Sequence, residues 1–133
     1  VILGLNEKEA IHVADVLELG VGNDDDKSRE QNMMDLATGI RAALNIKVCV
    51  VHPTQFAAAA NAEGAAVVAG PYVEKPKIST GAGDHFNAGF CTGQILGASL
   101  QESLQMGVGT SGYYVRNAQS PSSQQLAEFL ETL

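Results

Sequence analysis

The segment from Ser79 to Phe90 holds the residues of this chain best suited to chemistry. It places Asp84 directly after Gly81, Ala82 and Gly83, at the start of an expected helix. The first N–H groups of a helix lack a partner within it, and the helix dipole adds about half a positive charge there. Such an end suits a phosphoryl group, which glycines allow to approach closely. A carboxylate beside it can accept a proton from an attacking hydroxyl, so the segment predicts phosphoryl transfer.

A structural interpretation of the same segment stays open. Asp84 can simply complement the helix dipole while the glycines form a tight turn. The neighbouring His85 either perturbs the base or faces solvent. Two other phosphate motifs are excluded: Phe86 stands where a dinucleotide fingerprint needs its third glycine, and no Gly-Lys-Ser/Thr of a P-loop follows.

A second pair of polar residues follows the apolar stretch 1–4 near the start of the chain. Asn6 is placed to cap a helix, with Glu9 three residues later in the spacing of a capping box. On these residues alone, capping explains the pair.

Hydrophobic spacing along the chain predicts alternating strands and helices followed by a helical tail. We therefore expect an α/β fold, a three-layer αβα domain that spans residues 1–133 as one unit. The second helix is expected to bury its apolar face. The expected strands are 1–4, 46–51, a hairpin of 56–60 and 65–69, and a short strand at 72–75. The expected helices are 7–19, ended by Gly20 and Gly22, then 29–44, 81–96, ended by Gly97, 100–116 and 121–130, begun by Ser120 or Pro121. The residues expected to be buried in the second helix are Met33, Leu36, Ala37, Ile40 and Leu44.

Composition narrows the class of protein. The 133 residues include 8 Lys and Arg against 15 Asp and Glu, a formal charge of −7, which argues against a nucleic-acid binder. Cys49 and Cys91 lie in apolar segments without CxxC spacing, as in reduced, buried thiols of a cytoplasmic protein. No apolar run is long enough to span a membrane, and the opening residues are not expected to form a signal peptide. The run Asp24 to Asp26 is interpreted as a solvated turn rather than a metal site.

The chain opens in the middle of an apolar run at Val1, so we expect it to be the C-terminal part of a longer protein. The sequence Gly81 to Asp84, with Phe86 and Gly89, resembles the C-terminal signature of the ribokinase-like, or PfkB, carbohydrate kinases. The family's Asn-x-x-Glu motif is matched by Asn6 to Glu9, about 75 residues earlier. The resemblance covers essentially the whole chain and implies a kinase that uses ATP and Mg²⁺.

By this resemblance, Asp84 is the base that takes the proton from a sugar hydroxyl. The backbone amides of Gly81, Ala82 and Gly83 form the anion hole for the γ-phosphate. Asn6 and Glu9 help to hold the nucleotide phosphates and, through water, the hydrated Mg²⁺. Two further residues are expected to contact the nucleotide, Thr80 beside the anion hole and Asn117 near the adenine.

The chain departs from the family pattern in two places. The glycine-rich loop expected after strand 46–51 is replaced by residues 52–57, in which Pro53 removes a donor and Phe56 adds bulk. His52 there is either a phosphate contact or a structural residue. The Asp-Thr that often precedes the signature is replaced by Ile78 and Ser79, so we expect weak or absent dependence on K⁺.

The N-terminal half, which holds the sugar site and lid in this family, is absent from these residues. The fragment alone is therefore expected to be inactive. A nucleoside kinase of the same fold and a non-catalytic protein that binds a phosphorylated ligand stay open as alternatives. A homodimer is one expectation for the full-length protein.

Overall fold

The computed structural model describes residues 1–133 as four strands and five helices. The chain divides into two compact units, Val1–Val67 and Val68–Leu133. The single domain expected from the sequence stays a prediction. None of the helices is both long enough and apolar enough to span a membrane.

The chain forms one sheet with the strand order β1-β2-β3-β4. The strands are β1 (Ile2–Leu5), β2 (Val48–Val51), β3 (Phe56–Ala60) and β4 (Ala65–Ala69). Strands β1 and β2 are parallel, with Leu3 opposite Cys49, and β2 and β3 are antiparallel, with Val50 opposite Ala59. The predicted hairpin is confirmed, and the Asn61 side chain accepts hydrogen bonds from two backbone N–H groups in its turn.

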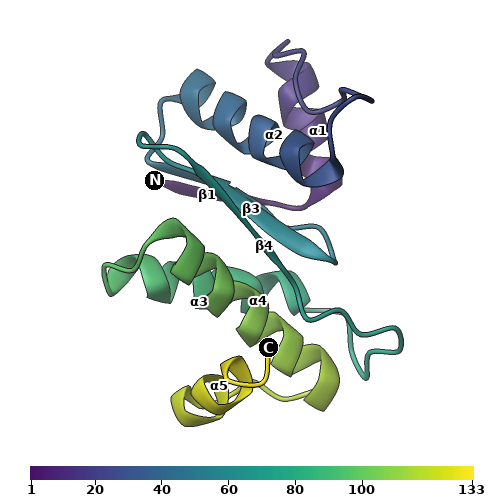
Figure 1. Ribbon diagram of the computed structural model, residues 1–133, viewed down its shortest axis with the longest axis vertical. Helices are drawn as coiled ribbons and strands as arrows, with labels where there is room; N and C mark the ends of the chain where they lie inside the picture. The colour runs from purple at the N-terminus through teal and green to yellow at the C-terminus, as the bar shows by residue number, and fades with distance from the viewer. The chain divides into compact units, whose positions relative to one another are not determined.

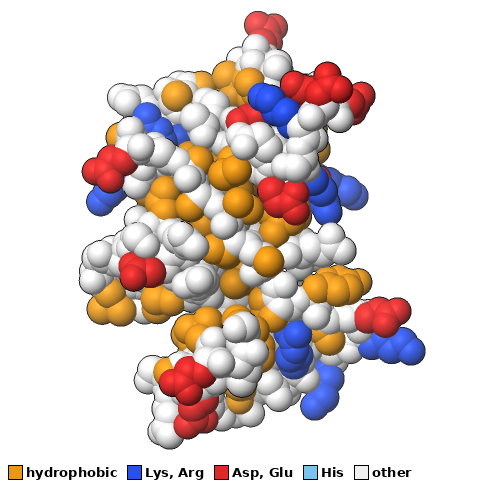
Figure 2. Space-filling view, viewed as in Figure 1, with side chains coloured by type: hydrophobic (Ala, Val, Ile, Leu, Met, Phe, Trp, Pro, Cys, Tyr) orange, Lys and Arg blue, Asp and Glu red, His pale blue; other side chains and the backbone are white.

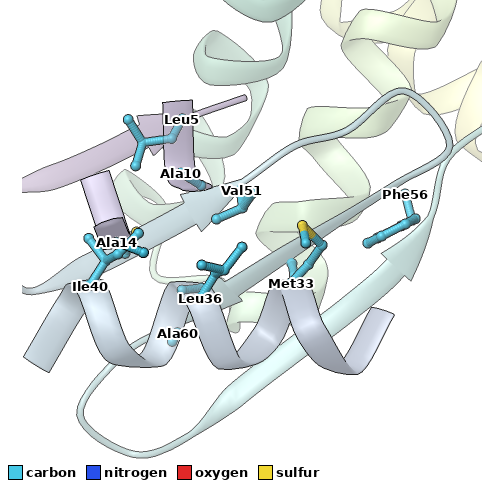
Figure 3. Close-up of a cluster of buried hydrophobic side chains, with 12 residues drawn as sticks. Leu5, Ala10, Ala14, Met33, Leu36, Ile40, Val51, Phe56 and Ala60 are labelled. Carbon is cyan, nitrogen blue, oxygen red and sulfur yellow. The ribbon is translucent and has the colours of Figure 1, made fainter. Parts of the chain in front are cut away.

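Two helices, α1 (Glu7–Val16) and α2 (Arg29–Leu44), lie on one face of this sheet (Figure 1). Figure 3 shows side chains of α2, among them Met33, Leu36 and Ile40, directed at the strands in a fully buried cluster. The bounds predicted for α2 are confirmed. The prediction that Leu44 lies in the core is wrong. Leu44 is the last residue of the helix, and its side chain is 41% exposed.

The predicted end of α1 at residue 19 is three residues too late. Glu18 takes a positive φ of 55°, which a continuing helix cannot contain, so the helix ends at Val16. Strand β2 begins at Val48 rather than at residue 46, because Asn45 turns the chain in the left-handed conformation and the Ile46 N–H donates back to the Arg41 carbonyl.

The second unit contains α3 (Ala82–Ile95), α4 (Leu100–Asn117) and α5 (Ser123–Leu130). Helices α3 and α4 pack antiparallel and very closely. A Cβ placed on Gly89 would lie 2.4 Å from the Met106 carbonyl oxygen, and one on Gly107 would lie 2.7 Å from the Phe86 ring. These glycines therefore set how near the two helix backbones approach.

Two sequence predictions in this unit are wrong. Residues 72–75 form no strand. Instead, the Arg116 guanidinium donates hydrogen bonds to the backbone carbonyls of Pro71, at 2.7 Å, and Tyr72, at 3.2 Å. The last helix is capped by Ser122, not by Ser120 or Pro121, because Ser122 forms a reciprocal capping box with Gln125.

Both cysteines are free thiols, as predicted. Cys49 is fully buried, and burial raises the pKa of its thiol to about 11. Cys91 is only partly buried, so the expectation that both thiols are enclosed is wrong for this residue.

Candidate active site

The turn before α3 presents unbonded backbone donors. Gly81 is the N-cap residue, with φ 89° and ψ 0°, and no side chain caps the helix. The Ala82 N–H donates to the Ser79 carbonyl at 3.1 Å, so one of the three predicted anion-hole amides already has a partner. The N–H groups of Gly81 and Gly83 have no acceptor in the chain, and neither has that of Asp84. Three donors are thus available at this helix end.

Asp84 is the third residue of α3 and is exposed. No ion pair or hydrogen bond engages its carboxylate. The arrangement that would have excluded a catalytic role, a buried and paired carboxylate, is not observed. The carboxylate therefore has free lone pairs within one helical turn of the unbonded N–H groups.

His85, the next residue, does not simply face solvent. Its ring is partly buried, with Nδ1 2.8 Å from the Gly81 carbonyl oxygen and Nε2 2.7 Å from the Ser120 hydroxyl. It stacks on Tyr114 of α4, with ring centroids 3.6 Å apart and planes at 12°. The Tyr114 hydroxyl donates to the Thr80 carbonyl at 2.9 Å.

Tyr114 was missed by sequence reasoning. It lies 34 residues after Thr80, within a helix whose spacing assigns it no special role. The two further residues predicted to contact the nucleotide, Thr80 and Asn117, are both exposed, and the Asn117 side chain donates to the Tyr113 carbonyl at 2.9 Å. Thr80 uses only its carbonyl in the contact with Tyr114.

The second predicted pair lies in the first unit, where it caps α1. The Asn6 Oδ1 accepts from the Glu9 N–H at 2.9 Å, and the Glu9 Oε2 accepts from the Asn6 N–H at 2.8 Å. The predicted capping box is confirmed. The remaining oxygen, Oε1, takes no part in this cap, and the Glu9 residue is exposed.

His52 follows β2 in the loop that departs from the family pattern. It is partly buried, and desolvation lowers the pKa of its imidazole below the ordinary 6.5. Its backbone N–H donates to the Leu5 carbonyl at 3.0 Å, which continues the β1–β2 pairing by one residue. These observations favour the structural interpretation of this histidine.

No three acidic, His or Cys side chains gather into a group that could hold a metal ion. Residues Asp24 to Asp26 form a turn, in which the Asp24 carboxylate accepts from the Asp26 N–H at 2.9 Å. Figure 2 shows acidic and basic side chains dispersed over the viewed face. Magnesium usually keeps several waters and binds one or two carboxylates together with substrate phosphates. The exposed Glu9 carboxylate, whose Oε1 takes no part in the cap, is a ligand of the type that this pattern requires.

Comparison with known proteins identifies the family. A family model described as prokaryotic ketohexokinase matches residues 1–133, the whole of the chain. The chain belongs to this family. The predicted membership of a carbohydrate kinase family is confirmed by this match. The solved structures that the chain resembles show the predicted ribokinase-like fold.

One curated relative is a ketohexokinase from Haloferax volcanii, 29% identical over 129 residues. That match covers 97% of this chain and 32% of the relative. Phosphofructokinase-2 from Escherichia coli, solved in complex with substrates and products, has a TM-score of 0.76 at 20% identity. A nucleoside kinase from Methanocaldococcus jannaschii has a TM-score of 0.71 at 17% identity. Each structural match covers 99% of this chain and 40% of the other, and confirms the α/β ribokinase-like fold.

Proposed function

We propose that the full-length protein transfers the γ-phosphate of ATP to a hydroxyl of a ketohexose. One observation carries the proposal: the unpaired carboxylate of Asp84 lies within the same helical turn as the unbonded N–H groups of Gly81 and Gly83. Donors for the charge of the transferred phosphoryl group and an acceptor for a proton are thereby combined. The ketohexose follows from the family description and from the name of the Haloferax volcanii relative.

In the proposed step, Asp84 takes the proton of the sugar hydroxyl as its oxygen attacks the γ-phosphorus. The new bond joins the sugar oxygen to phosphorus, and the bond between phosphorus and the β–γ bridging oxygen breaks to release ADP. The N–H groups of Gly81 and Gly83 stabilise the charge on the transferred phosphoryl oxygens.

The nucleotide site is proposed to include Thr80 and Asn117, which flank this turn and end α4, respectively. Glu9 is proposed to hold a water of the magnesium shell through Oε1, and Asn6 to contact the phosphates from the same cap. Bound Mg²⁺ would neutralise part of the phosphate charge. We expect residues 1–133 alone to be inactive, because the chain spans only 32% of the curated relative.

The test is an ADP-release assay of the full-length protein with fructose, other ketohexoses, aldoses and nucleosides. Turnover with a ketohexose well above that with aldoses supports the proposal. Preference for a nucleoside would replace the acceptor while retaining phosphoryl transfer. ATP binding in calorimetry without turnover of any acceptor would indicate a sensor and would overturn the proposed activity.

A further inference from the structure

We propose that Tyr114 and His85 are positioning residues, which orient the peptide units of the Gly81 turn so that its free N–H faces the transferred phosphate. The inference rests on the proposed function, because it concerns the same anion hole. Neither side chain needs to touch the substrate. Both act through the backbone of residues 80–82.

The first peptide unit joins Thr80 to Gly81. The Tyr114 hydroxyl donates to its carbonyl oxygen at 2.9 Å. In a trans peptide the C=O and the N–H point in opposite directions. Holding the Thr80 carbonyl against Tyr114 therefore directs the Gly81 N–H away from Tyr114, and that N–H has no acceptor in the chain.

The second peptide unit joins Gly81 to Ala82 and is held at both ends. Its carbonyl lies 2.8 Å from His85 Nδ1 and accepts from the His85 backbone N–H at 3.1 Å. Its N–H donates to Ser79 at 3.1 Å. A carbonyl only accepts, so Nδ1 must carry a proton, which in the neutral ring leaves Nε2 to accept from the Ser120 hydroxyl at 2.7 Å.

The two rings also hold each other. They stack at 3.6 Å across α3 and α4, which are themselves packed closely through glycines. Gly81 has φ 89°, a conformation from which an unrestrained glycine moves freely. The stacked rings on the two helices restrict that freedom. Such restriction matters because a catalytic site must be held within about 0.5 Å of its productive geometry.

The experiment compares Tyr114→Phe with Tyr113→Phe in the full-length protein. Tyr114→Phe removes one hydroxyl and retains the stacked ring. Tyr113 is the matched control, since it is the adjacent tyrosine of α4, packs edge-on against Phe129, and has no hydrogen bond at its hydroxyl. Removing an anion-hole donor costs about 10²- to 10³-fold in kcat, and misorienting one should cost about tenfold. We expect that loss in Tyr114→Phe, with an unchanged KM for the sugar, and wild-type kinetics in Tyr113→Phe.

A second pair of variants separates positioning from general damage. Asn places its side-chain N–H near the position of His Nδ1, so His85→Asn can still donate to the Gly81 carbonyl, whereas His85→Phe keeps only a stacking ring. We expect His85→Asn to retain most of the kcat that His85→Phe loses, at similar thermal stability. If Tyr114→Phe does not fold at the assay temperature, the two His85 variants alone test the positioning role.

Binding measurements distinguish this inference from the proposed function. The probes are AMP-PNP and adenosine, which carries no phosphate. If the wild type turns over no sugar but Tyr114→Phe weakens AMP-PNP binding and not adenosine binding, the activity is wrong and the positioning role stands. A kcat within twofold of wild type in Tyr114→Phe and His85→Phe overturns the positioning role. Equal loss of both probes in the variants overturns it as well.

Discussion

Asn6 and Glu9 each hold the backbone N–H of the other, through bonds of 2.9 and 2.8 Å that close a reciprocal cap on α1. The motif that resembles a kinase signature is therefore also a structural device. A substitution of Asn6 by alanine would remove the cap and the proposed phosphate contact together. The two roles can be tested separately only in a variant that preserves the cap.

Serine caps helices as well as asparagine does, and this allows the separation. We expect Asn6→Ala to lower the free energy of unfolding by about 1 kcal/mol and Asn6→Ser to change it little. If Asn6 also contacts phosphates, both variants should raise the KM for ATP several-fold. Urea unfolding and the ADP-release assay measure the two effects. A fully active Asn6→Ser protein would restrict Asn6 to capping.

Replacement of the proposed base should remove turnover and spare binding. We expect Asp84→Asn to lower kcat by about 10²- to 10⁴-fold, because it cannot accept the hydroxyl proton. The affinity for AMP-PNP should stay within about threefold, since the backbone donors are intact.

The control is Glu102→Gln. Glu102 holds the same third position in α4 that Asp84 holds in α3, and glutamine can retain its bond to the Ser99 N–H. In stopped-flow and steady-state assays, we expect this variant to have the kcat of the wild type. A near-normal kcat in Asp84→Asn would remove the carboxylate from the mechanism.

Two glycines with similar backbone angles should respond differently to alanine. Gly81 and Gly97 have φ of 89° and 79°, so Ala at either should cost about 1 to 2 kcal/mol of stability. A Cβ at Gly81 would lie 3.2 Å from the Tyr114 hydroxyl, whereas one at Gly97 meets no atom within 4 Å. We expect only Gly81→Ala to lower kcat. Equal activity of the two variants at matched stability would contradict the role of the Gly81 turn.

The lowered pKa of His52 predicts a pH dependence of folding. In the unfolded chain the imidazole gains a proton near its ordinary pKa of 6.5, and in the folded chain only at lower pH. Between these values the unfolded state binds more protons, so stability falls as the pH falls. Above pH 6.5 the titration of His52 no longer changes the stability.

We expect urea midpoints of the wild type to decrease between about pH 7.5 and 5.5, and those of His52→Gln to decrease less. Carboxylates titrate mostly below this range, so the difference between the two slopes reports on the histidine. Parallel slopes would show that His52 is not the group responsible.

Local signals predicted much of the fold. The bounds of α2, the turn of the hairpin and the cap at Asn6 follow from interactions between residues at most about four positions apart, which the sequence displays directly. The strand predicted for residues 72–75 was wrong because a local pattern does not reveal contacts with distant residues. Tyr72 and Val73 suggest a strand, but Arg116, more than 40 positions away, donates to the carbonyls of Pro71 and Tyr72 where that segment begins.

The sequence by itself determined the family, the order of the elements and the residue types at the candidate site, because a glycine turn, a helix start and a carboxylate lie together along the chain. Tertiary structure alone decided which amides of that turn have no acceptor and which rings hold it. Tyr114 lies 34 residues from the carbonyl that it binds, and only the packing of α4 against α3 brings them together. A contact over that distance depends on helix packing, which no local pattern of residues encodes.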